Sequence, residues 1–434
     1  MVEAALDDPA APAVPATPAG SRRAWGAVAL LTLVGTVNLA DRFLPSVLAE
    51  PIKHELLLSD TALGLINGFG FLLVYAVLGI PIARLSDRGA YGRVISACLA
   101  LWSVMTMLGG LAQTGLLLGL TRMGVALGEA GSAPAAHAYI SRNFRPERRA
   151  APLSVLTLSV PFASTVGLMG AGLLGQALGW RATFIAMGAV SLLLAPLVLV
   201  VLGGRPPAAS DMKAPSASRG ATLSLLKKRS FLTILAGSAF VAIAGYTLTA
   251  FVPAFLMRSH GLAVGQVGVQ YGIVSGIEGI AGLLITGYAA DRLSARDPRW
   301  LLWVLAAMIG LLIPFGVIGL LSPNRWVAIG GVGLANMVGT AYMVPVVVAI
   351  QRLAPVDLRA TASAILLFFS ALFGGLGPFL VGVISDALQA ELGPAALGRA
   401  LLLAPVAQVL AALLYLAAAS SFRRDMVPDD GRQP

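Results

Sequence analysis

The 434-residue chain is poor in charge, because only 12% of its residues are Asp, Glu, Lys or Arg whereas 57% are hydrophobic. A soluble domain carries about 25% charged residues and few long apolar runs. This scarcity excludes an ordinary water-soluble fold and indicates an integral membrane protein, in keeping with a mean hydropathy of +0.85. The single cysteine, Cys98, excludes an intramolecular disulfide, and we interpret it as a small packing residue.

Patterns typical of enzymes are missing as well. The three histidines, His54, His137 and His260, lie far apart and have no metal-ligand spacing. The sequence contains no G-x-S-x-G run and no P-loop. We therefore expect no enzyme activity, no cofactor, no metal site and no self-contained ATP-driven pump. A lipid-modifying enzyme and a channel stay as minor alternatives. Formation of a product from a lipid substrate would support the enzyme, and unitary currents would support the channel.

Apolar runs are instead abundant and are long enough to cross a membrane, which takes roughly 20 residues. They predict an all-α membrane protein with 12 transmembrane helices in two pseudo-symmetric six-helix bundles. The spans are expected at 25–48, 61–83, 94–113, 115–138, 152–177, 181–202, 231–256, 264–290, 300–321, 326–350, 361–386 and 396–421. The expected domains are a disordered tail 1–23, a bundle 24–202, a cytoplasmic linker 203–229, a bundle 230–421 and a tail 422–434.

The positive charge is distributed unevenly between the two sets of connecting segments. With both termini inside, 23 of the 30 Lys and Arg residues fall on the cytoplasmic side and five on the outer side. Arg42 and Arg122, within spans, complete the total. The net charge of +10 is therefore a topology signal and does not indicate nucleic-acid binding. The high Ala and Gly content suggests a bacterial inner membrane.

Two related sequences in the cytoplasmic links indicate that the halves are repeats. The run ARLSDR covers 83–88, and GYAADR covers 287–292. In each, three residues separate a small residue from an Asp-Arg pair. The small residue allows close helix approach, and the charges can pair with a neighbouring helix end. We expect a cytoplasmic latch formed by Asp87, Arg88, Arg93, Arg149, Asp291, Arg292 and Arg359.

Four charged residues inside spans are the strongest functional signal. Ionised side chains are costly in a bilayer and usually face an interior path. Asp41 and Arg122 are expected at similar depths, so they become neighbours if the first and fourth spans pack together. Glu129 is expected alone near the midplane, facing a cavity. We hypothesise that Asp41 and Glu129 bind protons and that Arg122 switches between them, against the alternative of a fixed salt-bridge cluster.

Other polar residues within spans give weaker signals. Glu278 is a lone carboxylate that could contact a cationic head group, carry a second proton or hydrogen-bond between helices. The tentative substrate path also contains residues that helix–helix hydrogen bonding explains equally well. The residues of this path are Glu278, Asn67, Gln270, Asn336 and Tyr342.

The links resemble those of the major facilitator superfamily. Its G-x-x-x-D-(R/K)-x-G-(R/K) motif matches at Asp87, Arg88, Gly92 and Arg93, but Ala83 replaces the first Gly and the spacing before Gly92 is longer. The superfamily pattern G-W-R-x-x-F is present at 179–184. This resemblance, which spans about 24–421, implies a secondary transporter that works by alternating access.

A narrower resemblance, to the spinster-like branch, rests on NLADR at 38–42 and TRMGVALGEA at 121–130. It implies proton coupling and gating by Asp41, Arg42, Arg122 and Glu129. It also implies a lipid-like amphiphile, of the lysophospholipid or sphingoid phosphate class, as substrate. The alternatives are a proton-coupled symporter of small organic anions and a multidrug/proton antiporter. The expected partners are the substrate, protons and membrane lipid, and a monomer is expected.

Overall fold

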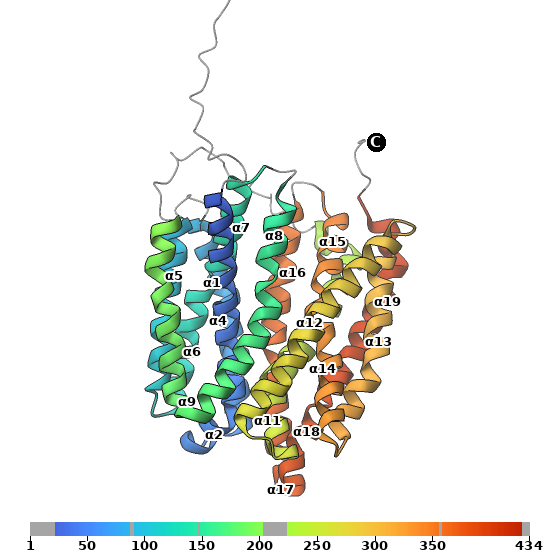
Figure 1. Ribbon diagram of the computed structural model, residues 1–434. Coiled ribbons are helices and arrows are strands. Elements are labelled where there is room, and N and C mark those ends of the chain that lie inside the picture. The colour runs from blue at the N-terminus through green and yellow to red at the C-terminus, as the bar shows by residue number, and fades with distance from the viewer. Residues whose placement is uncertain (1–21, 87–90, 146–147, 203–223, 356–357, 428–434) are drawn as a thin grey trace, which may run out of the picture.

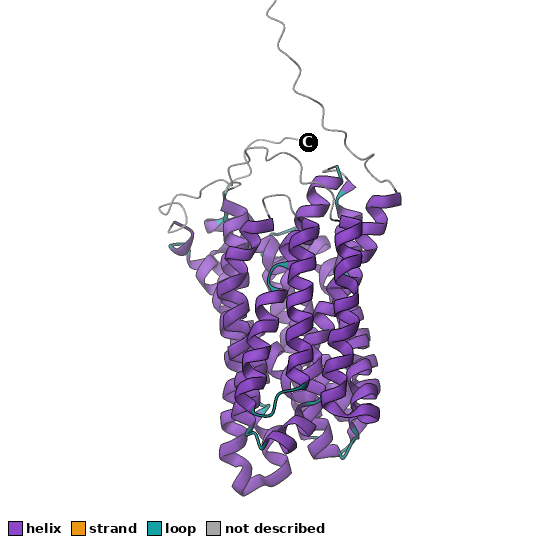
Figure 2. Ribbon diagram, turned by 90° about the vertical axis from the view of Figure 1, so that its left-hand side faces the viewer, coloured by secondary structure: helices purple, strands orange, loops and turns teal. Residues whose placement is uncertain are grey.

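A computed structural model describes residues 22–86, 91–145, 148–202, 224–355 and 358–427, and in these ranges the chain forms helices and no strands. The helices lie roughly along the long axis of the molecule and are joined by short loops at its two ends (Figure 2). We call the end where α1 begins and α19 ends the terminal end, and the opposite end, which carries α2, the α2 end (Figure 1).

The N-terminal half comprises the described helices up to residue 202. They are α1 (Arg22–Val47), α2 (Ala49–Leu56), α3 (Asp60–Gly64), the π-helix η1 (Leu65–Phe69), α4 (Gly70–Ser86), α5 (Tyr91–Gly110), α6 (Gly115–Glu129), α7 (Ser132–Asn143), α8 (Ala150–Thr157) and α9 (Ser159–Leu202).

The C-terminal half comprises the described helices from residue 229 on. They are α11 (Arg229–His260), α12 (Val264–Ser294), α13 (Trp300–Leu321), α14 (Arg325–Ala341), α15 (Met343–Leu353), α16 (Arg359–Gly374), α17 (Leu376–Leu392), the 3-10 helix η4 (Gly393–Ala395), α18 (Ala396–Ala400) and α19 (Leu403–Asp425). Within the described residues, nine helical segments are long and apolar enough to cross a membrane. The all-α membrane fold is therefore confirmed.

Several expected spans are interrupted, which corrects the expectation of one helix per span. The segment 115–138 is divided after Glu129 into α6 and α7, and 326–350 is divided at Tyr342 into α14 and α15. A proline, Pro134 or Pro345, is the third residue of the helix after each break. Proline is tolerated in a first helical turn because the hydrogen bond that it lacks is missing there anyway. The two halves thus share a helix break followed by a proline, in the fourth and in the tenth expected span.

The turn between the fifth and sixth spans depends on Gly179 and the residues after it. Trp180 Nε1 donates to Glu55 Oε2 at 2.6 Å, and Arg181 donates from Nε to Glu55 Oε1 at 2.7 Å and from Nη1 to the carbonyl of Ala112 at 2.6 Å. Hydrogen bonds from Arg181 and Trp180 hold the pKa of Glu55 below its ordinary value. Because the pKa is lowered, this contact persists at neutral pH and weakens only as pH falls through the lowered value. The residues at 179–184 therefore link their own turn to α2 and to the loop between α5 and α6 at the α2 end.

Replacing Gly179 with alanine is expected to destabilise the protein by about 1–3 kcal/mol, because its backbone conformation is essentially restricted to glycine. Gly179 has φ 78° and ψ 164°, and a Cβ there would meet no atom within 4 Å, so the cost is backbone strain alone. Thermal unfolding followed by tryptophan fluorescence measures the effect. The matched control is Gly170→Ala, also in open space but helical, which should not lower stability. Equal unfolding temperatures for wild type and Gly179→Ala would contradict the strain argument.

The two halves pack closely where glycines face each other. A Cβ on Gly172 of α9 would lie 2.7 Å from the Cα of Gly268 of α12. At the α2 end, a Cβ on Gly382 of α17 would lie 2.4 Å from the carbonyl oxygen of Asp60. Small residues of this kind allow helix backbones to approach in membranes. They bring the two halves into direct contact at the α2 end.

Candidate functional site

The first charge pair joins α1 to α6. Arg122 Nη1 lies 3.1 Å from Asp41 Oδ2, and both side chains are 3% exposed. Thr106 of α5 donates from Oγ1 to the same carboxylate at 3.0 and 3.1 Å. The expectation that Asp41 and Arg122 are neighbours is confirmed. A buried carboxylate with a guanidinium and a hydroxyl as donors is a well-satisfied anion.

The second pair corrects the expected position of Glu129. Arg42 Nε lies 2.7 Å from Glu129 Oε2, and the glutamate side chain is fully buried. Glu129 is therefore not alone: the long side chain of Arg42 reaches it from α1. Its other oxygen, Oε1, has no hydrogen-bond partner among the described residues. Glu129 is also the last residue of α6, directly before the break at 130–131.

Aromatic rings of α4 cover the two guanidinium groups. The Arg42 guanidinium carbon lies 4.6 Å from the ring centre of Tyr75 and 5.5 Å from that of Phe71. Phe71 also lies 5.0 Å from the Arg122 guanidinium carbon. Rings at these distances attract cations through the negative potential of their faces. They hold the arginines in place without neutralising their charge.

A cavity of about 260 Å³ lies between the two halves, and both arginines line it. Asp41 and Glu129 are not among the lining residues, so the carboxylates lie behind the arginines and the cavity presents positive charge. The expectation that Glu129 faces the cavity is wrong in this conformation. Apolar and aromatic side chains from both halves form much of the remaining wall, including Leu39, Phe43, Phe71, Val160, Val241, Tyr246 and Met343.

The residues expected on a substrate path separate into two groups. Asn67, Asn336 and Tyr342 line the cavity, and Asn67 belongs to the π-helix η1. Single-turn π-helices are frequent at functional sites. Gln270 and Glu278 do not line the cavity. Glu278 contacts it indirectly, because Asn336 Nδ2 donates to Glu278 Oε1 at 2.9 Å.

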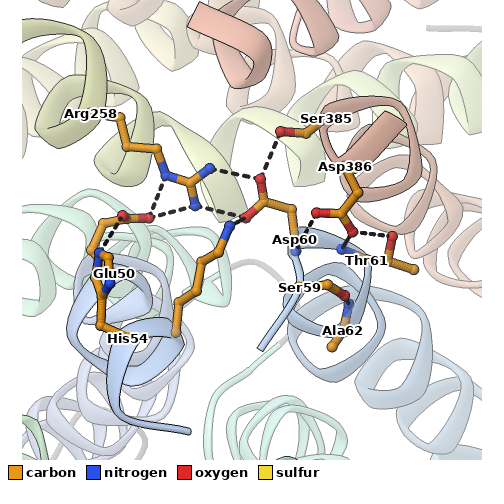
Figure 3. A network of polar contacts seen from close by, with 10 residues as sticks. Glu50, His54, Ser59, Asp60, Thr61, Ala62, Arg258, Ser385 and Asp386 are labelled. Carbon is orange, nitrogen blue, oxygen red and sulfur yellow. Dashed lines mark hydrogen bonds and ion pairs between the residues drawn. The ribbon is translucent and has the colours of Figure 1, made fainter. Parts of the chain in front are cut away.

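A second site, the polar network at the α2 end, was not predicted from the sequence. Arg258 of α11 donates from Nη1 and Nη2 to Asp60 Oδ2 and Oδ1, both at 2.7 Å, and from Nε to Glu50 Oε1 at 2.7 Å. Figure 3 shows the guanidinium of Arg258 between these two carboxylates of the N-terminal half. Asp60 also accepts from Lys53 Nζ at 2.6 Å within its own half.

Helix α17 of the C-terminal half completes the network. Ser385 Oγ donates to Asp60 Oδ2 at 2.7 Å. The Asp386 carboxylate accepts from the backbone N–H groups of Asp60 and Thr61, each at 2.9 Å, and thereby caps the first turn of α3 (Figure 3). These contacts between the halves close the α2 end. The available signal in the sequence was a carboxylate at one end of each of two apolar runs, at Asp60 and Asp386.

The expected latch at the terminal end is only partly described. Asp87 and Arg88 lie outside the described residues, and Arg93 and Asp291 are exposed. Arg149 donates to the carbonyls of Ser141 and Phe144 in its own half. Arg292 Nη1 donates to Tyr288 Oη at 3.1 Å on its own helix, and Arg359 is the first residue of α16. The latch therefore stays a prediction.

Comparisons with known proteins agree with this architecture. The family model of the Major Facilitator Superfamily matches residues 31–378. The chain is 55% identical to an MFS-type efflux pump of Mycolicibacterium smegmatis over 411 residues, covering 94% of this chain and 96% of that protein. It is 25% identical to the sphingosine-1-phosphate transporter SPNS2 of Xenopus tropicalis, covering 95% of this chain and 85% of that protein.

Among solved structures, a bacterial homolog of the human lysosomal transporter spinster, in an inward-facing and unoccupied conformation, matches with a TM-score of 0.84 and 27% identity. The match covers 94% of this chain and all of that one. The chain belongs to the Major Facilitator Superfamily and is thus a membrane transporter, not an enzyme. Its relatives place it with the spinster-like transporters of that superfamily.

Proposed function

We propose that this protein is a proton-coupled transporter that moves an amphiphile with an anionic head group by alternating access. The observation that carries the proposal is the arrangement of Arg42 and Arg122, which line the cavity while their carboxylate partners lie behind them. Two guanidinium groups suit a phosphate or carboxylate head group. The apolar remainder of the cavity wall suits a hydrocarbon tail. The 55% identical relative is an MFS-type efflux pump, which supports a transport function for this chain.

Proton coupling follows from competition for Arg42. A proton on Glu129 removes the charge that holds Arg42 at 2.7 Å, and the guanidinium is then available to an anionic head group. Loss of the proton draws Arg42 back to Glu129 and releases the head group. Asp41 and Arg122 act as the companion pair, held by Thr106. In this proposal Arg42 exchanges its partner, and Arg122 is the more firmly fixed arginine.

Alternating access further requires that the halves 24–202 and 230–421 move as bundles joined by the segment 203–229. We propose that the terminal end faces the cytoplasm, as the distribution of Lys and Arg favours. Because the Arg258 network closes the α2 end, we infer that the cavity opens toward the cytoplasmic side in this conformation. The latch residues Asp87, Arg88, Asp291 and Arg292 would then close the cytoplasmic end in the opposite conformation. The transporter works as a monomer in a bacterial inner membrane.

Transport into liposomes tests this function. Purified protein is reconstituted with a pH gradient, and three probes are compared: a fluorescent lysophosphatidic acid, glucuronate and ethidium. Gradient-dependent movement of the lysophosphatidic acid alone is expected, because the arginine-lined wall attracts an anionic head and repels a cationic dye. Arg42→Gln should abolish this movement, whereas Arg399→Gln, which removes an exposed positive charge of α18, should preserve it. Movement of glucuronate alone would support the organic-anion symporter, and movement of ethidium alone would support the multidrug antiporter.

A further inference from the structure

Glu278 is a buried carboxylate in the middle of α12, within the C-terminal half. The residue is 5% exposed. Its oxygen Oε1 accepts from Asn336 Nδ2 of α14 at 2.9 Å and lies 3.5 Å from Ser275 Oγ. Its other oxygen, Oε2, has no hydrogen-bond partner among the described residues. Asn336 and Ser275 both line the central cavity, so Glu278 is separated from the cavity by two neutral side chains.

The surroundings of Glu278 differ from those of the other two carboxylates beside the cavity. Asp41 has Arg122 and Glu129 has Arg42, each within hydrogen-bond distance. In the described part of the chain, the side-chain contacts of Glu278 are to the neutral groups of Asn336 and Ser275. An ionised carboxylate buried without a positive partner is strongly disfavoured. A cation must therefore accompany Glu278.

The described residues that α14 and α9 place beside this part of α12 carry no charge. From α14, Gly333 lies beside Oε2. From α9, Pro161 and Thr165 face α12 one turn or less from Glu278, at Gly279 and Gly276. Tyr271, two turns earlier on α12, is the titratable group within electrostatic reach, and it is itself neutral or negative. A proton is the one cation that fits an oxygen enclosed in this way.

We propose that Glu278 is a second proton-binding group of the transporter, loaded while the α2 end is closed. On release, the O–H bond of the carboxyl breaks and a cavity water accepts the proton, leaving a carboxylate that is stabilised by the Asn336 N–H. This inference deepens the proposed function, because it places one proton site in each half. Glu129 in the N-terminal half is linked to the substrate through Arg42. Glu278 in the C-terminal half is linked to the cavity through Asn336.

Infrared difference spectroscopy on the full-length protein in liposomes tests the inference without any substrate. At neutral pH, the C=O stretching band of protonated carboxyl groups should lose one component in Glu278→Gln. Glu391→Gln, which removes an exposed carboxylate of α17, should leave the band unchanged. Asn336→Ala provides a second variant if Glu278→Gln folds poorly. It should shift the same component to higher frequency, because a donor to the carbonyl oxygen is lost.

A band that is unchanged in Glu278→Gln, or in Asn336→Ala where only that variant folds, would overturn the inference. The proposed function is judged separately, by the liposome transport of lysophosphatidic acid. Loss of the infrared component without any transport in wild type would support the proton site and contradict the transport proposal. Gradient-driven transport with an unchanged infrared band would support the transport proposal and contradict the proton site.

Discussion

Replacement of Arg258 by glutamine is expected to open the α2 end and to shift the protein away from the conformation described above. Arg258 is 11% exposed at its side chain and pairs with the fully buried Asp60 and with Glu50. Removing one partner of a buried ion pair costs about 3–5 kcal/mol, because the remaining charge is left uncompensated. Asp60 keeps Lys53, which reduces this cost, but the ion pairs that Arg258 makes between the halves are lost, and the hydrogen bonds of Ser385 and Asp386 to α3 remain.

Distances between spin labels at Leu57 of the N-terminal half and Glu391 of the C-terminal half measure this opening. Both positions are exposed near the α2 end, and Cys98 is first replaced by serine so that only the introduced cysteines are labelled. A new, longer-distance population should appear in Arg258→Gln. Arg325→Gln, at an exposed arginine that begins α14, serves as the matched control and should leave the distances unchanged. If Arg258→Gln gave the same distances as wild type, other contacts would hold the α2 end closed and the proposed role of the Arg258 network would be wrong.

The second large effect is expected from Glu129→Gln. The substitution keeps the shape of the side chain but removes the charge that holds Arg42. A hydrogen bond to a charged group is worth about 1.5–3 kcal/mol, so an anionic head group should bind roughly 10- to 100-fold more tightly once this competitor is gone. Transport against a gradient should stop, because protonation no longer controls access to Arg42.

Two measurements separate binding from coupling in this variant. Fluorescence titration with the labelled lysophosphatidic acid gives the affinity at pH 6 and pH 8, and the liposome assay gives the coupled rate. Wild type should bind more tightly at the lower pH, whereas Glu129→Gln should bind tightly at both. Glu55→Gln, which removes a carboxylate of α2 remote from the cavity, should behave like wild type. If Glu129→Gln kept the wild-type pH dependence of binding, the coupling proton would have to bind at Asp41 or at Glu278 instead.

The pairing of Asp41 with Arg122 was predictable from the sequence, whereas that of Arg42 with Glu129 was not. Depth along two packed helices follows from the rise of 1.5 Å per residue, and this sufficed for the first pair. The second pair depends on how each helix is rotated and on the length of an arginine side chain. Neither quantity can be read from apolar periodicity in a helix that is hydrophobic on most sides.

The helix breaks and the α2-end network illustrate a further limit of sequence reasoning. Apolar composition defines where a span lies but not whether its helix is continuous, so the breaks before Ser132 and Met343 were missed although Pro134 and Pro345 mark them. Lys53 and Arg258 counted only as rare positive charges on the outer side. The contact of Arg258 with Asp60 joins residues 198 positions apart, and such pairing is fixed by the packing of the two halves.

Lys53 lowers the electrostatic cost of opening the α2 end. Because Lys53 and Asp60 belong to the same half, the aspartate retains a counter-ion at 2.6 Å when Arg258 departs. Arg258 itself must then be hydrated, and a guanidinium is more weakly hydrated than an ammonium group and so depends less on water. The ion pair of Asp60 can thus be broken and remade: when the halves separate, this buried aspartate exchanges one positive partner for another and stays paired, cycle after cycle.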